Sequence, residues 1–545
     1  MAAQEQVNKV LQEADSVIRA LVKKLEPLAG LAVGIVHRGE LIYTFNTGFA
    51  DIKTRTPVTS DTVFRIMSIS KTFTAVALMQ LWEQGKFQLD DPINQHLKAI
   101  RVEHPDLNAP PITVRHLLTH TSGIGELRKV DPRWLLKPEN MVLEDLGARD
   151  LKDAPALPAY YQGKLTAEIY PGIKWCYCNH AFGVLGQLVE DLSGQPFEQY
   201  AVAHIFKPLG MTQSDWFLSD LVRDRLATGY LFENNRFKTV EAKQGYQHVV
   251  TAGASNIYSS VNDMVLYVAA LMNGGANANG RILQPETLAL MTQPHFQLDP
   301  RLPGQGLAFF LRDIGGHRTI GHSGGWSGFI SQMLVAPDDE LALLVFTNTS
   351  NRAPTPIATD LMRRLLGLPD PVTQLPRADV SEQPHLWGDL CGNYGPTPGP
   401  NTNFRHWNTL AGEVEVFVDG NHLVMRSPDG LYKAGVQLHP IAVDDPLVFE
   451  IAILDNVQKV VFKRNASGAI ERLQIGVNDF YKKPTPSELP LAQAIDQLQT
   501  QVRRKRANVV YWYMTGMPDK LKALGRIVLA LAVLRLLWRR RRAAS

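Results

Sequence analysis

Two pairs of short apolar runs, one near each end of residues 1–368, determine the fold that we expect. The first pair lies within residues 31–45 and the second within residues 329–346, and each pair flanks a polar turn. Such runs are typical of β-hairpins. Between them the apolar positions mostly recur at helical spacing, as in 71–84 and 181–192. We therefore predict an α+β domain in which one antiparallel sheet, built from both ends of the domain, is flanked by helices and a helical subdomain.

The segment before the first hairpin is predicted to be an amphipathic helix. Its apolar residues recur at helical spacing from Val7 to Leu25, among acidic and basic residues. It has no apolar core of seven residues, which a secretory signal needs. We therefore expect a cytoplasmic location.

The pattern changes after residue 368. Residues 369–385 are rich in proline and polar residues and are predicted to be a linker. Residues 386–483 show about six to eight short apolar runs with frequent turns, which predicts a small all-β barrel. Residues 484–545 show a helical pattern that is broken near Gly516.

The formal net charge of +3 hides an asymmetry along the chain. Residues 487–545 hold twelve basic and three acidic side chains, which leaves −6 for the rest and disfavours nucleic acid as a partner. The apolar stretch 527–538 is shorter than the about twenty residues that span a membrane. With Trp538 and four arginines after it, it fits either a helix at an anionic membrane surface or a helix docked on the protein or on a second copy.

Cysteine is sparse, with only Cys176, Cys178 and Cys391. Three cysteines form no disulfide framework, and no Cys/His group has the spacing of zinc ligands, so we expect no metal site. Cys176 and Cys178 are either a redox pair or small buried side chains, and the second interpretation is favoured.

The first candidate for chemistry is Ser68-Ile69-Ser70-Lys71, at the beginning of a strongly helical run. Ser68 would lie at the helix start, where backbone N–H groups and the dipole favour negative charge. Lys71 lies one turn further on the same face, and a buried lysine can lose its proton near neutral pH and activate a hydroxyl. The alternative is a helix-capping serine beside an exposed lysine.

A second candidate is Tyr177-Cys178-Asn179, at a loop end before an apolar helix. The Tyr177 phenol could pass a proton to a leaving group. The Asn179 amide offers both a donor and an acceptor. A buried aromatic residue and a helix-capping asparagine are the alternative.

The third candidate is His322-Ser323-Gly324-Gly325, directly before a predicted strand. Adjacent glycines let a ligand approach the backbone, and a free strand N–H can bind an oxyanion. A glycine-rich turn with a surface histidine is the alternative.

Taken together, these motifs resemble those of the penicillin-recognising serine hydrolases, which include class C β-lactamases, D-alanyl-D-alanine carboxypeptidases, D-aminopeptidases and β-lactamase-like esterases. The S-x-x-K, Y-x-N and K/H-x-G elements match at Ser68, Tyr177 and His322, and the runs 112–123 and 207–211 are also similar to the family. The resemblance covers about residues 30–348. The β-rich module resembles, more weakly, the lipocalin-like C-terminal domain of some relatives.

The resemblance implies a role for each candidate residue. Ser68 would be the nucleophile, Lys71 its base and Tyr177 a shared base and proton shuttle. The N–H groups of Ser68 and Gly325 would form the oxyanion hole. Asn179, His322 and Gly324 would bind and orient the substrate. No metal or organic cofactor is implied.

His322 stands where class C enzymes have a lysine that binds the carboxylate of β-lactams. Because imidazole is mostly neutral above a pH of about 6.5, a fixed cation for an anionic substrate is missing. We therefore expect a serine hydrolase of the esterase or peptidase type acting on a small ester, amide or peptide. A β-lactamase or D-Ala-D-Ala carboxypeptidase is the alternative, and a membrane-associated or filament-forming scaffold is an alternative of another class.

Overall fold

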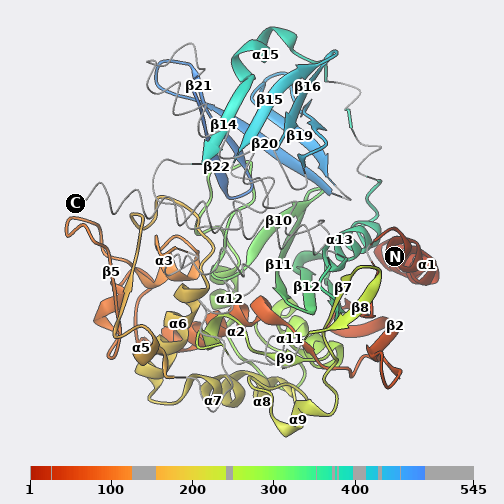
Figure 1. Ribbon diagram of the computed structural model, residues 1–545, viewed down its shortest axis with the longest axis vertical. Helices are drawn as coiled ribbons and strands as arrows, with labels where there is room; N and C mark the ends of the chain where they lie inside the picture. Colours follow the sequence, from red (N-terminus) through yellow and green to blue (C-terminus); the bar gives the residue numbers. More distant parts are fainter. Residues whose placement is uncertain are drawn as a thin grey trace, which may run out of the picture.

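The computed structural model describes residues 2–25, 27–125, 155–240, 249–351, 353–370, 375–376, 380–396, 413–427, 432–453 and 456–484. Within them lie a sheet flanked by helices, a helical region and a second, β-rich unit (Figure 1). The predicted α+β class is confirmed.

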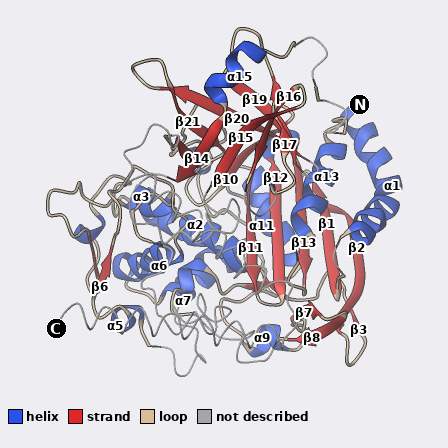
Figure 2. Ribbon diagram, turned by 45° about the horizontal axis from the view of Figure 1, so that its top comes forward, coloured by secondary structure: helices blue, strands red, loops and turns tan. Residues whose placement is uncertain are grey.

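The large sheet has seven strands, and both ends of the predicted catalytic region, residues 1–368, contribute to it. Strands β1 and β13 pair antiparallel in its middle, with Leu31 opposite Thr347 and His37 opposite Leu341. Both predicted hairpins are therefore present and lie side by side (Figure 2). In spatial order the strands are β10 (Phe310–Ile314), β11 (His317–Trp326), β12 (Phe329–Ala336), β13 (Leu341–Thr347), β1 (Gly30–His37), β2 (Glu40–Asp51) and β3 (Thr56–Pro57).

Helices cover both faces of this sheet. On one face α1 (Ala2–Lys24) and α13 (Pro354–Leu365) pack through Val7, Ile18 and Leu361 onto alternate side chains of β1 and β13. This confirms the amphipathic helix expected at 1–26. The other face carries the larger core, which includes α2 (Ser70–Glu83) and α11 (Val261–Met272) (Figure 2).

The helical region lies between the two hairpins in sequence and beside the sheet in space (Figure 1). Helix α6 (Asn179–Ser193) packs against α2 and against the 3-10 turn η7 (Ala252–Ala254). The other helices are α3 (Val114–Leu118), α5 (Leu157–Tyr160), α7 (Phe197–Ala201), α8 (Lys207–Leu209), α9 (Asp220–Arg223) and α12 (Pro285–Met291). Three two-stranded pairs complete it: β4 (Phe64–Arg65) with β9 (Tyr258–Ser259), β5 (Arg101–Glu103) with β6 (Lys164–Thr166), and β7 (Tyr230–Glu233) with β8 (Arg236–Thr239).

The β-rich unit is a nearly closed antiparallel barrel. Its nine described strands exceed the six to eight expected, because β17 and β18 are only two residues long and leave little apolar pattern. Helix α15 (Pro384–Leu390) packs on it. In spatial order the strands are β17 (Val436–Gln437), β16 (His422–Arg426), β15 (Val414–Asp419), β14 (Gly392–Pro396), β22 (Asn478–Lys482), β21 (Ile470–Ile475), β20 (Asn456–Arg464), β19 (Val448–Ile453) and β18 (His439–Pro440).

The barrel docks on the loop 298–302 of the catalytic region. Asp299, whose side chain is 1% exposed, accepts hydrogen bonds from Arg301 at 2.7 and 2.8 Å and pairs with Lys463 of the barrel. Arg301 also binds both carboxylate oxygens of Asp445 in the barrel, each at 2.7 Å. Leu302 packs beside these ion pairs with buried barrel residues. Two ion pairs and an apolar contact therefore hold the barrel in place.

The basic helical tail predicted for 484–545, with its membrane or protein partner, lies outside the described residues from residue 485 onward. Within the described ranges, no helix combines the length and apolar character that crossing a membrane requires.

Candidate active site

Ser68 lies in a strained 3-10 turn directly before α2. The turn η1 spans Met67–Ile69, and α2 begins at Ser70, two residues after the predicted helix start. Met67 has φ +53°, a left-handed conformation that costs a residue other than glycine about 1–2 kcal/mol. The carbonyl of Ile66, one residue earlier, accepts a hydrogen bond of 2.8 Å from the Ser331 hydroxyl on β12. The sheet therefore fixes the backbone that presents Ser68.

Lys71 is fully buried and lies at the centre of the candidate residues. Its Nζ is 3.1 Å from Ser68 Oγ, 2.7 Å from Asn179 Oδ1 and 2.8 Å from the Ala254 carbonyl oxygen. The same Nζ lies 4.8 Å from the centre of the Tyr177 ring. These three oxygens carry no formal charge. Two motifs more than a hundred residues apart in sequence therefore meet at one amine.

The Tyr177-Cys178-Asn179 segment leads into α6. Cys178 caps this helix, because its Sγ accepts a hydrogen bond of 3.3 Å from the Ala181 N–H. Its own N–H donates to His120 Nδ1 at 3.1 Å. Asn179, at the first turn of α6, is 8% exposed and directs its amide oxygen at Lys71. Cys176 and Cys178 are both buried and form no disulfide, which agrees with the favoured interpretation.

His322 lies on β11, close to Tyr177. It is 2% exposed, and its ring stacks on Phe310 with centroids 4.5 Å apart and reaches 6.3 Å from the Tyr177 ring. Its Nδ1 lies 2.6 Å from the Ser323 carbonyl oxygen. Since a carbonyl only accepts, Nδ1 carries a proton.

Gly324 lets strand β11 approach the turn that carries Ser68. A Cβ at this position would lie 2.1 Å from the Ile66 carbonyl oxygen, 2.4 Å from Ser331 Oγ and 2.9 Å from Met67 Cβ. Only glycine fits such an approach. Gly325 follows directly along β11, and a Cβ there would meet nothing nearer than Ile330 Cδ1 at 3.4 Å.

Two residues of this site were missed by the sequence analysis. His120, fully buried and at φ +60°, stacks on Tyr177 with ring centroids 4.4 Å apart. It lies within the family-like run 112–123, so that run gave a signal that was not used. Ala254 contributes only its carbonyl oxygen, which no side-chain pattern reveals.

The barrel lies close to this site. Trp175 Nε1, two residues before Tyr177, donates at 3.2 Å to Gln305 Oε1, three residues after the loop 298–302 that docks the barrel. Burial lowers the pKa of Lys174, while the charges of Cys176 and of the barrel residue Asp479 oppose that shift. Barrel charges therefore reach the segment that carries Tyr177.

The structure thus places Ser68, Tyr177 and Asn179 around the amine of Lys71. The His322 ring lies next to the Tyr177 ring. Gly324 packs against the residues directly before Ser68, and Gly325 is its neighbour. Among the described residues, no group of three or more His, Cys, Asp or Glu side chains could hold a metal ion. The arrangement suits nucleophilic attack by a serine hydroxyl with a lysine base.

Comparison with known proteins identifies the family of the chain. The family model described as Beta-lactamase matches residues 16–367. Among curated proteins, the chain is 29% identical over 357 residues to "Esterase EstB" of Burkholderia gladioli, covering 59% of this chain and 86% of the esterase. It is 28% identical over 346 residues to a D-aminopeptidase of Brucella anthropi, covering 62% of this chain and 59% of that protein.

The solved structure of an octameric penicillin-binding protein homologue from Pyrococcus abyssi shares the fold, with a TM-score of 0.54 and 22% identity. It covers 87% of this chain and 99% of its own. The barrel lies outside the range that the family model matches, so its likeness to a lipocalin-like domain stays a prediction.

Proposed function

The chain belongs to the beta-lactamase family, and we propose on this basis that it hydrolyses a small ester or amide through an acyl-enzyme at Ser68. The observation that supports this most directly is the distance of 3.1 Å between Lys71 Nζ and Ser68 Oγ, at a lysine with no exposed surface. Burial disfavours the charged ammonium, and a neutral amine at this distance can accept the serine proton.

The proposed reaction has two halves. Ser68 Oγ attacks the substrate carbonyl carbon while its proton moves to Lys71, and the negative charge that develops on the carbonyl oxygen is bound by the N–H groups of Ser68 and Gly325. The tetrahedral intermediate collapses as Tyr177 and Lys71 pass a proton to the leaving alcohol or amine. A water molecule then attacks the acyl carbon, the same groups accept its proton, and Ser68 leaves protonated.

The ester or peptide preference rests on His322. Imidazole is mostly neutral above a pH of about 6.5, so His322 supplies no permanent cation, and its ring lies flat against Phe310. This favours an uncharged ester or a peptide over a β-lactam carboxylate as the substrate. The relatives include proteins named as an esterase, a D-aminopeptidase and a beta-lactamase, so the preference does not rest on them.

Labelling with a fluorescent fluorophosphonate tests the proposal. We expect wild type to be labelled, and Ser68→Ala to remain unlabelled. Lys71→Met and Tyr177→Phe should be labelled at least about a hundredfold more slowly. Ser70→Ala is the matched control. Ser70 is two residues after Ser68 in sequence, and its hydroxyl oxygen accepts a hydrogen bond of 3.2 Å from the Ile257 N–H. Labelling that survives the loss of Ser68 refutes the proposed nucleophile, and a wild type without labelling favours the scaffold.

Substrate class is assigned with p-nitrophenyl esters, D-alanine p-nitroanilide and a chromogenic cephalosporin. We expect kcat/KM for the best ester or anilide to exceed that for the cephalosporin by at least about a hundredfold, a difference of about 2.7 kcal/mol in transition-state binding. A cephalosporin turned over as well as the esters would place the protein with the β-lactamases.

A further inference from the structure

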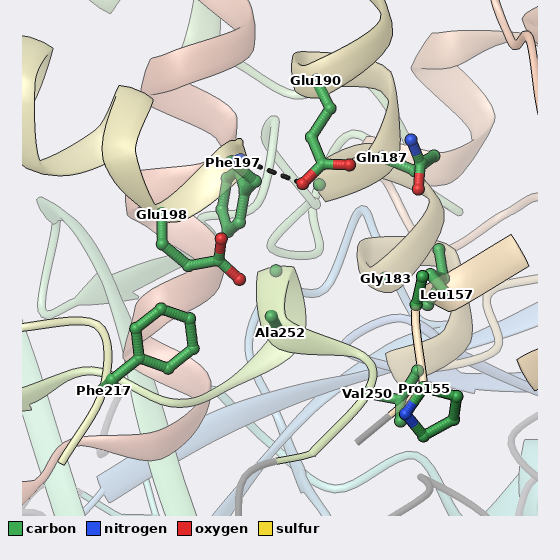
Figure 3. Close-up of a pocket in the computed structure, with 13 residues that line it drawn as sticks. Pro155, Leu157, Gly183, Gln187, Glu190, Phe197, Glu198, Phe217, Val250 and Ala252 are labelled. Atoms are coloured by element: carbon green, nitrogen blue, oxygen red, sulfur yellow. Dashed lines mark hydrogen bonds between the residues drawn. The ribbon is translucent and has the colours of Figure 1, made fainter. Parts of the chain in front are cut away.

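A second cavity lies on the side of η7 away from Lys71. Its volume is about 340 Å³, within the lower range for sites that hold small molecules. It is open to solvent on one side, and one face of α6, the beginning of α7 and two loops line it (Figure 3). Its described lining is Pro155, Ala156, Leu157, Gly183, Gly186, Gln187, Glu190, Phe197, Glu198, Phe217, Val250, Ala252 and Gly253.

The turn η7 separates this cavity from the Ser68 site. Ala252 and Gly253 line the cavity, whereas the next residue, Ala254, directs its carbonyl oxygen at Lys71. Helix α6 packs tightly on this turn, since a Cβ at Gly253 would lie 2.3 Å from the Phe182 carbonyl oxygen. The cavity is therefore a neighbour of the active site and not part of it.

Two carboxyl groups point into the cavity. Glu190 and Glu198 are directed at the same space, above Ala252 and beside Phe217 (Figure 3). Glu190 Oε1 accepts a hydrogen bond of 3.0 Å from the Phe197 N–H. Burial, with a smaller effect from the Glu190 charge, raises the pKa of Glu198 to about 7. The described lining includes no lysine, arginine or histidine, so these residues supply no positive charge.

The remaining walls are apolar. Phe197 and Phe217 present aromatic rings, and Leu157, Val250 and Pro155 contribute aliphatic surface. A cation is attracted both by the carboxylates and by ring faces, and an apolar body gains by leaving water. An anion would be repelled, and a neutral apolar molecule would further desolvate the Glu198 carboxylate without supplying a positive charge.

We propose that this cavity is a second small-molecule site, separate from Ser68, which binds a small organic ammonium ion with an apolar body. The ammonium lies between Glu190 and Glu198, and the apolar body lies against Phe217 and Leu157. Gln187 offers an amide oxygen as a further acceptor.

Isothermal titration of the full-length protein at pH 8 tests this with benzylammonium as the probe and benzyl alcohol as its uncharged counterpart. We expect saturable binding of benzylammonium, at least about tenfold tighter than benzyl alcohol. Glu198→Gln keeps the side-chain shape and should weaken benzylammonium by about tenfold, with a similar loss in Glu190→Gln. Glu233→Gln, an exposed hairpin carboxylate, is the matched control and should bind as wild type.

The same titration on fluorophosphonate-labelled protein and on Ser68→Ala separates the two sites. Unchanged affinity supports a distinct cavity, and loss of binding on labelling would place the probe in the Ser68 site and overturn the proposal. No saturable binding at roughly 10 mM, equal affinity for alcohol and ammonium, or an unchanged affinity in both Glu→Gln variants would also overturn it.

Discussion

Replacing Asp299 by asparagine should loosen the barrel from the catalytic region. The Asp299 carboxylate is 1% exposed and binds Arg301 and the barrel residue Lys463, and these hydrogen bonds hold the pKa of Asp299 well below its usual range. Removing one partner of a buried ion pair costs about 3–5 kcal/mol. Because the Arg301 and Lys463 side chains are each 35% exposed, water recovers part of this, and we expect a loss of about 2–3 kcal/mol.

A double-mutant cycle measures the part that belongs to the pair. Urea denaturation of wild type, Asp299→Asn, Lys463→Met and the double variant should give a coupling free energy of about 1–2 kcal/mol. The control cycle uses Lys238 and Glu233, a pair at 2.8 Å that is 38% and 51% exposed. We expect the control coupling to be below about 0.5 kcal/mol. Equal coupling free energies in the two cycles would show that burial of Asp299 does not strengthen its ion pair with Lys463, and would refute the predicted role of this pair.

Kinetics provide a second measurement of the same change. Gln305, three residues after the docking loop 298–302, accepts a hydrogen bond from Trp175 beside Tyr177. We therefore expect Asp299→Asn to raise KM for an ester substrate about threefold or more while kcat changes by less than about twofold. A fall in kcat at constant KM would mean that the loop acts on the chemical step and not on substrate positioning.

Three further changes have defined outcomes. Glu198→Gln should stabilise the protein at pH 8 by about 2–3 kcal/mol and leave its stability unchanged at pH 4. The Glu198 carboxyl has a pKa of about 7 in the folded protein and 4.5 in the unfolded chain, so the wild type loses stability as the pH rises between these values. Urea midpoints at both pH values check this. Gly324→Ala should lower kcat/KM by at least about a hundredfold, since its Cβ would lie 2.1 Å from the Ile66 carbonyl, whereas Gly325→Ala should cost less than about tenfold. His322→Lys should speed acylation by labelled penicillin by about tenfold, because the lysine adds a cation for the penicillin carboxylate. The rate is measured by gel fluorescence over time, and an unchanged rate would show that residue 322 does not face the substrate.

Local patterns predicted the elements that carry the site. The hairpin strands β1 and β13 are short continuous apolar runs, α2 is a longer run that is mostly apolar, and α6 repeats its apolar positions at the helix period, so each appeared within a few residues of its expected bounds. The motifs at Ser68 and Tyr177 could be recognised from the few residues that directly follow them in sequence. The structure adds that Lys71 lies between them.

Contacts between distant residues could not be read from the sequence. The Ala254 carbonyl reaches Lys71 because η7 packs on α6, and only the folded chain shows this. The Arg301–Asp445 and Asp299–Lys463 pairs each join residues more than 140 positions apart, whose charges alone are unremarkable. The strain at Met67 also leaves no mark on the sequence, since methionine itself does not favour that backbone.

The pairing of β1 with β13 has a consequence for how the protein matures. Leu31 and Thr347 are opposite each other in the sheet, so during synthesis β1 has no partner on that edge until more than three hundred further residues have been added. The face of α1 that packs on α13 waits equally long. Gly324 and Ser331, which contact the residues directly before Ser68, are also synthesised late. A nascent chain therefore carries Ser68 and Lys71 early, yet the proposed active site cannot assemble until translation of this region is almost finished.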